Sequence, residues 1–406
     1  MHVIAPERYQ AKPEPKPRRW RWFVAIPAVV IAVGLAANYL RPLPTPVATL
    51  QVVLPKPAAT PQLAWPGSGQ AAAAAEGYGL LGTSGTISPL ATASTTKVIL
   101  ALCVLQKHPL APGQNGATYT IGAHDVALYQ AYADVGGSLL PVTSGEKLTE
   151  YQALRALMIP SANNIADSLV AWVFGSHDAY SAYATNFLQK NGMSQTHIGN
   201  DASGMDASTT STASDLTTLG LLALKNPVLM EIAGQKQASF PVAGLVDNYN
   251  TVLGQNGITG LKTGNSDEDP GAFIFTANAS VGDTVIPLAG AVMGAPDLGT
   301  ALQSSVQLVA SLQQGFEPVA AVAADGKVGS LQAAWGATSA IVAEKPLTVV
   351  RWKSTPLTET HTVDTAARSG RVGSLKVSSG RAQQQTALKL AQPLPGPSFW
   401  WRLTRH

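Results

Sequence analysis

A serine and a lysine three residues apart stand directly before the apolar run Val98 to Leu105. If a helix begins at Ser94, residues three apart share one face, so the Ser94 hydroxyl and the Lys97 amine meet at the helix start. The unpaired backbone N–H groups there favour developing negative charge and disfavour a protonated lysine. A neutral Lys97 could therefore take the Ser94 proton and activate that hydroxyl as a nucleophile.

The same spacing recurs at Ser144 and Lys147, so the pair by itself is not specific. Ser144-Gly145, however, is typical of a turn, and it precedes a helix that Thr149 is expected to cap. Ser94 opens an apolar helix instead. The context favours Ser94 as the nucleophile.

Two further polar motifs follow. Directly after Pro160, Ser161-Ala162-Asn163-Asn164 opens a second apolar helix over Ile165 to Phe174. Alone, this motif is typical of a helix cap. Gly257 to Gly264 has the period of a strand and contains Lys262-Thr263-Gly264, with glycines where something could approach the backbone closely. Taken alone, it could equally be a strand with a terminal turn.

The elements that must position these motifs alternate between helix and strand up to Gly315 and are strands beyond Phe316. Phe399 to Leu403 is interpreted as a last strand with its rings in the core; the alternative is an aromatic and basic interfacial anchor. The other expected strands are Gln70 to Leu81, Thr118 to Ile121, Ala272 to Ala277, Thr284 to Met293, Leu347 to Trp352, Val372 to Val377 and Thr386 to Leu390. The other expected helices follow Thr149 up to Pro160 and span Asp178 to Asn191, Leu216 to Leu224 and Leu298 to Gln313.

Composition bounds the problem. A chain of 406 residues with 46% hydrophobic residues can bury a large core and is expected to hold two folded domains with appendages. The net charge is +3, but the first 21 residues carry +4, which leaves −1 for the rest. Nucleic acid is therefore not an expected partner. The single Cys103 lies in an apolar helical run and is expected to be a buried hydrophobe.

Phe23 to Leu40 is uncharged and close to the length of a transmembrane helix. Basic residues precede it and only Arg41 follows closely, so the positive-inside tendency predicts a cytoplasmic N-terminus and an extracytoplasmic remainder. The alternatives are a cleaved signal peptide and a buried soluble helix. Seven prolines between Arg41 and Gly69 predict an extended spacer that holds the folded part away from the membrane.

Ser-x-x-Lys, Ser-x-Asn and Lys-Thr-Gly occur here in one order, and jointly they are far more specific than any one of them. Ser94 and Ser161 are 67 residues apart, whereas Ser144 lies only 17 residues before Ser161. From about Gln70 to Gly315 the chain resembles the low-molecular-mass penicillin-binding proteins of the serine D-alanyl-D-alanine carboxypeptidase family. The stretches that carry the resemblance are Ala93 to Lys97, Met158 to Asn164 and Asp247 to Gly264; beyond Phe316, Trp335 and Val372-Gly373-Ser374-Leu375 resemble the family's second domain.

The resemblance implies an α+β fold, in which a DD-peptidase or β-lactamase-like domain has an antiparallel sheet flanked by helices. It implies a basic cytoplasmic tail (1–21), a transmembrane anchor (22–40), a Pro-rich linker (41–69), a serine DD-peptidase domain (70–315), a small all-β domain (316–396) and an aromatic and basic tail (397–406). Relatives with a C-terminal amphipathic helix use it as a tether. None is expected here, so the N-terminal helix is expected to tether the chain.

The family's roles can be carried over residue by residue. Ser94 would attack the peptide bond between two terminal D-alanines of a peptidoglycan stem peptide, and Lys97 would be the base. Ser161 would relay a proton and Asn163 would orient Lys97 and hold the substrate amide. Lys262 and Thr263 would bind the terminal carboxylate, with the substrate lying as a strand beside Gly264. The backbone N–H groups of Ser94 and Asn265 would form the oxyanion hole. β-Lactams would acylate the same serine, and neither a metal nor another cofactor is implied.

Two departures bear on specificity. Relatives often place an arginine in the strand after the Lys-Thr-Gly strand, where this chain has Met293-Gly294-Ala295-Pro296, so a preference for a free C-terminal carboxylate is less secure. The loop Ser266 to Pro270 is also acidic beside an anionic substrate.

The sequence leaves other functions open, and the residues present favour some of them more than others. A D,D-endopeptidase would use the same residues. A class A β-lactamase would need a glutamate, and none occurs between Tyr151 and Met230. An inactive wall-binding scaffold would be expected to lose a catalytic residue. A Ser-His-Asp hydrolase lacks its Gly-x-Ser-x-Gly elbow around Ser94, and metal catalysis lacks a ligand motif.

Overall fold

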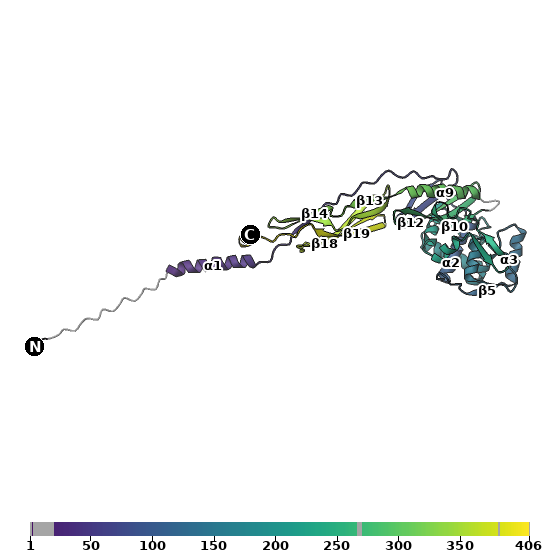
Figure 1. Cartoon of the computed structure of the whole chain (residues 1–406). Coiled ribbons are helices and arrows are strands. Elements are labelled where there is room, and N and C mark those ends of the chain that lie inside the picture. Colours follow the sequence, from purple (N-terminus) through teal and green to yellow (C-terminus); the bar gives the residue numbers. More distant parts are fainter. Residues whose placement is uncertain (1, 3–19, 266–269, 381, 406) are drawn as a thin grey trace.

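The structure is a computed structural model, which describes residues 2, 20–265, 270–380 and 382–405. The molecule is elongated: helix α1 (Trp20–Leu40) stands at one end, a domain of strands lies next, and a domain of helices and strands forms the far end (Figure 1). Most of the basic tail and residues 266–269 of the acidic loop lie outside the described residues.

The far end, which we call the mixed domain, is built on a five-stranded antiparallel sheet. Its order is β10-β11-β12-β2-β3, with β10 at one edge. The strands are β2 (Gln70–Ala75), β3 (Gly79–Ser84), β10 (Ile258–Gly264), β11 (Gly271–Val281) and β12 (Thr284–Ala295).

The expected single strand over Gln70 to Leu81 is wrong, because the chain reverses within it. Gly77 and Gly79 have φ of +81° and +78°, a conformation that glycine adopts without steric cost. The turn makes a hairpin of β2 and β3 in which Ala75 pairs with Gly79. The turn residues Glu76-Gly77-Tyr78-Gly79 were the available signal.

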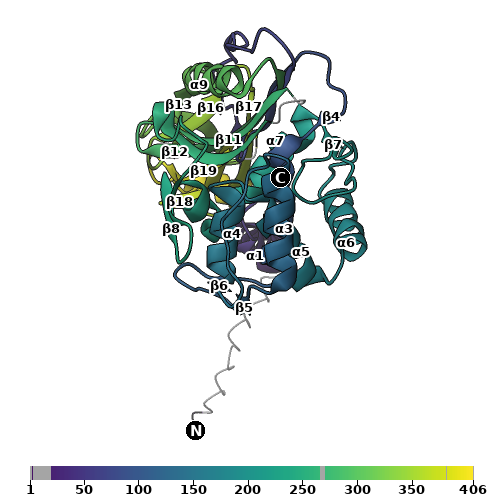
Figure 2. The ribbon, with the colours of Figure 1, turned by 90° about the vertical axis from the view of Figure 1, so that its right-hand side faces the viewer.

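Helices cover both faces of this sheet. On one face α7 packs on β2 and β12 over a large apolar core, and on the other α9 packs on β11 over a second core. Figure 2 looks onto the mixed domain with its helices in front. The helices are α2 (Lys97–Lys107), α3 (Ala123–Asp134), α4 (Glu150–Met158), α5 (Asn163–Phe174), α6 (His177–Lys190), α7 (Ala213–Ala223), α8 (Pro227–Ala233) and α9 (Leu298–Gln314), with 3₁₀ turns η1 (Ala93–Thr96) and η2 (Gln255–Gly257).

Short hairpin-like pairs complete the domain. They are β4 (Leu90–Ala91) with β7 (Thr210–Ser211), β5 (Thr118–Thr120) with β6 (Lys147–Thr149), and β8 (Gln237–Phe240) with β9 (Gly244–Asp247).

The predicted cap at Thr149 is confirmed. The Thr149 hydroxyl accepts from the Gln152 backbone N–H at 3.2 Å, and the Gln152 amide oxygen accepts from the Thr149 N–H at 2.9 Å. Such a reciprocal box satisfies two N–H groups that a helix start leaves free. The Thr212 hydroxyl caps α7 by accepting from the Asp215 N–H. Cys103 is fully buried, as expected.

The second folded part, which we call the β domain, contains the strands beyond Phe316, as predicted. A six-stranded sheet has the order β1-β14-β15-β19-β18-β17, and β13 pairs with β16. The strands are β13 (Phe316–Val322), β14 (Lys327–Gln332), β15 (Thr338–Ala343), β16 (Leu347–Trp352), β17 (Leu357–Val363), β18 (Arg371–Ser379) and β19 (Ala382–Leu390). They enclose their own apolar core.

The Pro-rich segment is extended, as expected, but it is tied to both folded parts. Its strand β1 (Val47–Leu50) pairs with β14 at the edge of the sheet. Farther along, the Ala58 N–H donates to the Lys353 carbonyl, and the Ala64 N–H donates to the Ser311 hydroxyl on α9. The segment therefore runs along the β domain and reaches the mixed domain.

The expectation of a last strand at Phe399 to Leu403 is wrong. These residues form the short helix α10 (Phe399–Thr404), which begins where the Ser398 hydroxyl accepts from the Trp401 N–H. Phe399 and Trp400 are 58% and 72% exposed rather than in the core. A C-terminal helix is therefore present, against expectation, and it packs on the end of α1.

Candidate functional site

Ser94 lies in the 3₁₀ turn η1, one residue after Ala93, whose φ is +44°. The turn is held where the Thr95 hydroxyl donates to the Thr92 carbonyl at 2.6 Å. Lys97 begins α2, so the two side chains lie one turn apart, and the Lys97 Nζ is 2.7 Å from the Ser94 Oγ. The predicted meeting of hydroxyl and amine at a helix start is therefore present.

Lys97 is fully buried, and its amine has three hydrogen-bond partners. Besides Ser94, it contacts the Asn163 Oδ1 at 2.7 Å and the Ser203 carbonyl at 2.6 Å. Burial, and then the nearby charge of Lys262, lower the pKa of Lys97 well below its ordinary value, while Asp201 and Asp167 oppose this shift. The site thus favours a neutral amine, which a general base requires.

Ser161 and Asn163 come from the turn that leads into α5. Ser161 has a φ of +59°, and its Oγ is buried with no hydrogen-bond partner among the described residues. Strained backbone and an unpaired buried hydroxyl are costly and concentrate at functional sites. Behind them, the Asn164 side chain holds both the N–H and the carbonyl of Leu140, which fixes the neighbouring loop that carries Ser138.

Lys262 lies on the edge strand β10 and is 1% exposed. Its Nζ donates to the Thr263 carbonyl at 3.1 Å, and burial lowers its pKa to about 7. Gly264 of the same strand is closely approached by the η1 turn. A Cβ there would stand 2.9 Å from both the Thr92 carbonyl oxygen and the Thr95 side chain, so the close approach that needs glycine is that of the η1 turn.

A cavity of about 150 Å³ joins these motifs. Its lining includes Ser94 and Ser161 together with Thr263 and Asn265 of the β10 end, and Asn265 is exposed. Lys97 and Lys262 lie buried behind this lining. Segments far apart in the sequence therefore meet at one site, as the three motifs predicted. Backbone N–H groups of Ser94 and Asn265 as an oxyanion hole remain a prediction.

Four contributors were not predicted from the sequence. Ser138, Tyr249 and Leu298 also line the cavity, and the Ser203 carbonyl holds Lys97. A carbonyl carries no residue-type signal. Tyr249 stands between two asparagines in the loop that precedes the Lys-Thr-Gly strand, and this polar run was the one available hint.

The second Ser-x-x-Lys pair lies elsewhere. Ser144 and Lys147 are exposed on the turn into β6, and Gly145 has a φ of +86°. This is the turn that the sequence predicted. Neither residue lines the cavity at Ser94.

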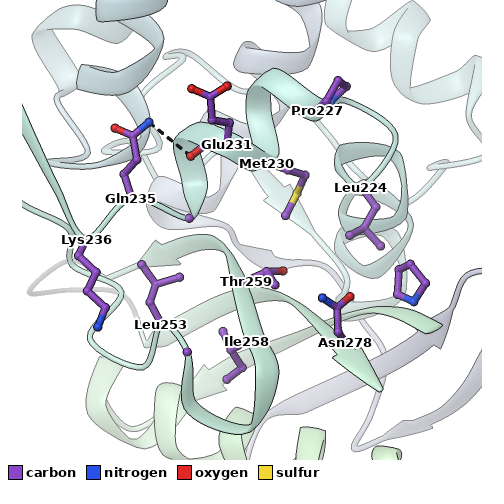
Figure 3. A pocket seen from close by; sticks show the side chains of 13 residues that line it. Leu224, Pro227, Met230, Glu231, Gln235, Lys236, Leu253, Ile258, Thr259 and Asn278 are labelled. Atoms are coloured by element: carbon purple, nitrogen blue, oxygen red, sulfur yellow. Dashed lines mark hydrogen bonds between the residues drawn. The ribbon is translucent and has the colours of Figure 1, made fainter. Parts of the chain in front are cut away.

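A larger cavity of about 680 Å³ lies between α8 and the first residues of β10 (Figure 3). Met230 and Leu253 face each other across it, with Glu231 and Lys236 at its margin. Its lining includes none of the three motifs. Size alone therefore does not identify the reactive site, and the smaller cavity at Ser94 carries the chemistry.

The fold and the site together define a class of protein: an α+β fold that presents a serine to a buried lysine of lowered pKa, beside a second hydroxyl and a second lysine. This is the arrangement that an acyl-transferring serine nucleophile requires. The model of the D-alanyl-D-alanine carboxypeptidase family, peptidase family S11, matches residues 82–297, and the chain belongs to this family.

Known proteins agree with that membership. The chain is 32% identical over 192 residues to the D-alanyl-D-alanine carboxypeptidase DacB2 of Mycobacterium tuberculosis. That match covers 46% of this chain and 61% of the relative, so the chain spans less than two thirds of the length of this curated relative.

Two solved structures share the fold. Penicillin-binding protein 5 from Haemophilus influenzae has a TM-score of 0.58 at 16% identity, covering 84% of this chain and all of that one. Penicillin-binding protein 6B from Escherichia coli has a TM-score of 0.58 at 20% identity, covering 85% and 99%. The predicted family and the α+β fold are confirmed.

Proposed function

We propose that this protein is a serine D-alanyl-D-alanine carboxypeptidase that removes the terminal D-alanine from peptidoglycan stem peptides. The observation that carries the proposal is the buried Lys97 amine, 2.7 Å from the Ser94 hydroxyl and held by Asn163. A buried lysine with a lowered pKa is the base that activates a serine without histidine.

The reaction proceeds in two stages. Lys97 takes the Ser94 proton while the Ser94 Oγ bonds to the carbonyl carbon between the two D-alanines. The C–N bond then breaks, and the leaving amine takes a proton through Ser161, whose buried hydroxyl has no partner among the described residues. Water next attacks the ester carbonyl and frees Ser94. A β-lactam acylates the same oxygen.

The substrate lies beside β10, an edge strand that can accept a further strand. Lys262 and Thr263 bind its terminal carboxylate. Because the pKa of Lys262 is about 7, its positive charge is partial near neutral pH and is favoured when an anion arrives. The N–H groups of Ser94 and Asn265 stabilise the tetrahedral oxyanion.

We also propose that residues 70–315 form the catalytic domain and 316–396 a separate β domain, with an uncleaved membrane anchor at 22–40. Trp22–Leu40 has a mean hydropathy of 2.1, and none of that stretch is buried within the protein. Such a helix suits a bilayer, and the basic residues before it favour an extracytoplasmic catalytic domain.

An endopeptidase that cuts cross-links is the second candidate. The described residues lining the cavity include no arginine, the residue with which relatives often hold the substrate carboxylate. Incubation with a stem pentapeptide and with a cross-linked muropeptide, followed by mass spectrometry, separates the two. Release of D-alanine from the pentapeptide supports the carboxypeptidase, and cleavage of the cross-link alone supports the endopeptidase.

Labelling with a fluorescent penicillin tests the nucleophile. Ser94→Ala should abolish labelling while thermal unfolding is retained, because no other atom forms the ester. Ser144→Ala, which changes the other Ser-x-x-Lys pair, is the matched control and should label normally. Retained labelling in Ser94→Ala would place the nucleophile elsewhere.

A further inference from the structure

The end of α1 and the helix α10 meet at one place, although more than 350 residues separate them in the sequence. Helix α10 packs on the last turn of α1, at the end of the molecule opposite the mixed domain (Figure 1). We define the juxtamembrane unit as residues 38–44 together with 398–405. We propose that this unit binds the anionic phospholipid headgroups of the leaflet in which α1 ends, an inference that rests on the proposed membrane position of α1.

Hydrogen bonds lock the two segments together. The Asn38 side-chain amide donates to the carbonyls of Leu403 and Arg405 at 2.9 and 2.8 Å. In return the Arg405 guanidinium donates to the carbonyls of Asn38, Arg41 and Pro42, which lie at the end of α1. A helix end leaves such carbonyls without partners. Arg405 satisfies them, so α10 is fixed at the level where the apolar helix stops.

Aromatic contacts join the unit to α1 and to the β domain. The Tyr39 and Phe399 rings lie 5.6 Å apart, and the Arg402 guanidinium lies 5.3 Å from the centre of the Tyr39 ring. Trp401 packs at 5.7 Å from Trp335 of the β domain. The juxtamembrane unit therefore contacts both the membrane helix α1 and the β domain.

The segment of α10 combines two exposed aromatic rings with two half-buried arginines, Arg402 and Arg405. Phe399 and Trp400 are 58% and 72% exposed, although large aromatic side chains are normally covered. Aromatic rings beside arginine are typical of the layer between acyl chains and water. At the end of an apolar helix, that layer is the surface these rings would enter.

The charge of the unit has one sign. The sequence has no Asp or Glu between Glu14 and Glu76, nor after Asp364, while Arg41, Arg402 and Arg405 gather here. Arg41 and Arg405 also line a hollow of about 570 Å³ together with Trp401. Positive side chains at a bilayer surface attract anionic lipid, which makes the headgroup phosphate the complementary partner.

The full chain in lipid nanodiscs tests the proposal. Thr404→Cys places a thiol on the exposed side of α10, one turn beyond Trp400. Cys103 is fully buried, so an environment-sensitive thiol dye labels position 404 alone. Relative to the same dye in water, its emission should shift to the blue in discs that contain anionic lipid. The shift should be smaller in purely zwitterionic discs. A dye at Val135→Cys, exposed on the mixed domain, is the control and should not shift.

The dye spectrum at position 404 gives the ratio of membrane-bound to water-exposed α10. Arg402→Gln should lower this ratio in anionic discs about fivefold, which is the contribution of one cation near such a surface. Arg371→Gln removes an exposed arginine of the β domain and should leave the ratio unchanged. An unshifted dye at 404, an equal shift in zwitterionic discs, or an equal loss in Arg371→Gln would overturn the proposal. Penicillin labelling of the same samples reports the active site independently.

Discussion

The two buried lysines of the mixed domain and the surface ion pairs of the β domain place charged groups in opposite environments. In the mixed domain Lys97 and Lys262 are 0% and 1% exposed, and neither forms an ion pair within the described chain. In the β domain the pairs of Arg371 with Glu344 and of Lys389 with Asp325 lie at the surface. Burial without a carboxylate partner lowers the pKa of an amine, whereas an exposed ion pair favours both charges.

This difference fits different roles for the two domains, catalysis in the mixed domain and structural stability in the β domain. Burying two lysines disfavours folding at pH values where they would be charged in the unfolded chain. The mixed domain tolerates this because a neutral Lys97 is the base that the proposed reaction needs. The β domain obtains its stability from an apolar core, and its ion pairs contribute little.

The largest effect is expected from removing the buried amine next to Ser94. Lys97→Met keeps the chain length of the side chain but supplies no base, so the acylation rate constant for a fluorescent penicillin should fall by about 10²- to 10⁴-fold. Lys147→Met removes the exposed lysine of the same spacing and should acylate at the wild-type rate. An acylation rate within a few-fold of wild type in Lys97→Met would contradict the role of Lys97 as the base.

The second effect concerns the contact between the two domains. Trp352 of the β domain is 4% exposed, packs on Gly315 at the end of α9, where a Cβ would stand 2.1 Å from its ring, and belongs to the apolar core under α9. Trp352→Ala should therefore cost about 3–5 kcal/mol of unfolding free energy. Calorimetry should show the mixed and β domains unfolding in separate transitions. Val285→Ala, at an exposed position, is the control; an unchanged single transition would contradict the contact.

The third effect is a pH dependence. Because burial lowers the pKa of Lys262 from 10.5 to about 7, the unfolded chain binds one more proton than the folded chain between these values. The unfolding free energy should thus rise with pH there by about 1.4 kcal/mol per pH unit from this group, and stay level below pH 7. Urea unfolding at pH 7.5 and 9.5 should show this rise reduced in Lys262→Met and retained in Lys236→Met. If the unfolding free energies of wild type and Lys262→Met changed in parallel with pH, the lowered pKa of Lys262 would be refuted.

The smallest effect is expected at the surface of the β domain. Arg371 is 70% exposed where it pairs with Glu344 at 2.7 Å, and solvent screens such a pair. Arg371→Ala should leave the melting temperature unchanged within error at low and high salt. A clear, salt-sensitive loss would show that the surface pairs of the β domain do support its fold.

Most of the fold was predictable because its elements carry strong local signals. Thr149 caps its helix as expected, and the strands beyond Phe316 form a β domain. The two errors have local causes. The turn at Gly77 splits an apolar run into a hairpin, and Ser398 starts a helix in an aromatic run that alone fits a strand equally well.

The sequence by itself determined the family, the three motifs and the spacing that brings Ser94 and Lys97 onto one helix face, because these depend on residue type and helical period. Tertiary structure alone decided which Ser-x-x-Lys pair is buried, that Ser203 offers its carbonyl to Lys97, and that α10 packs on α1. Burial and backbone contacts arise between segments far apart in the chain, so no local pattern encodes them.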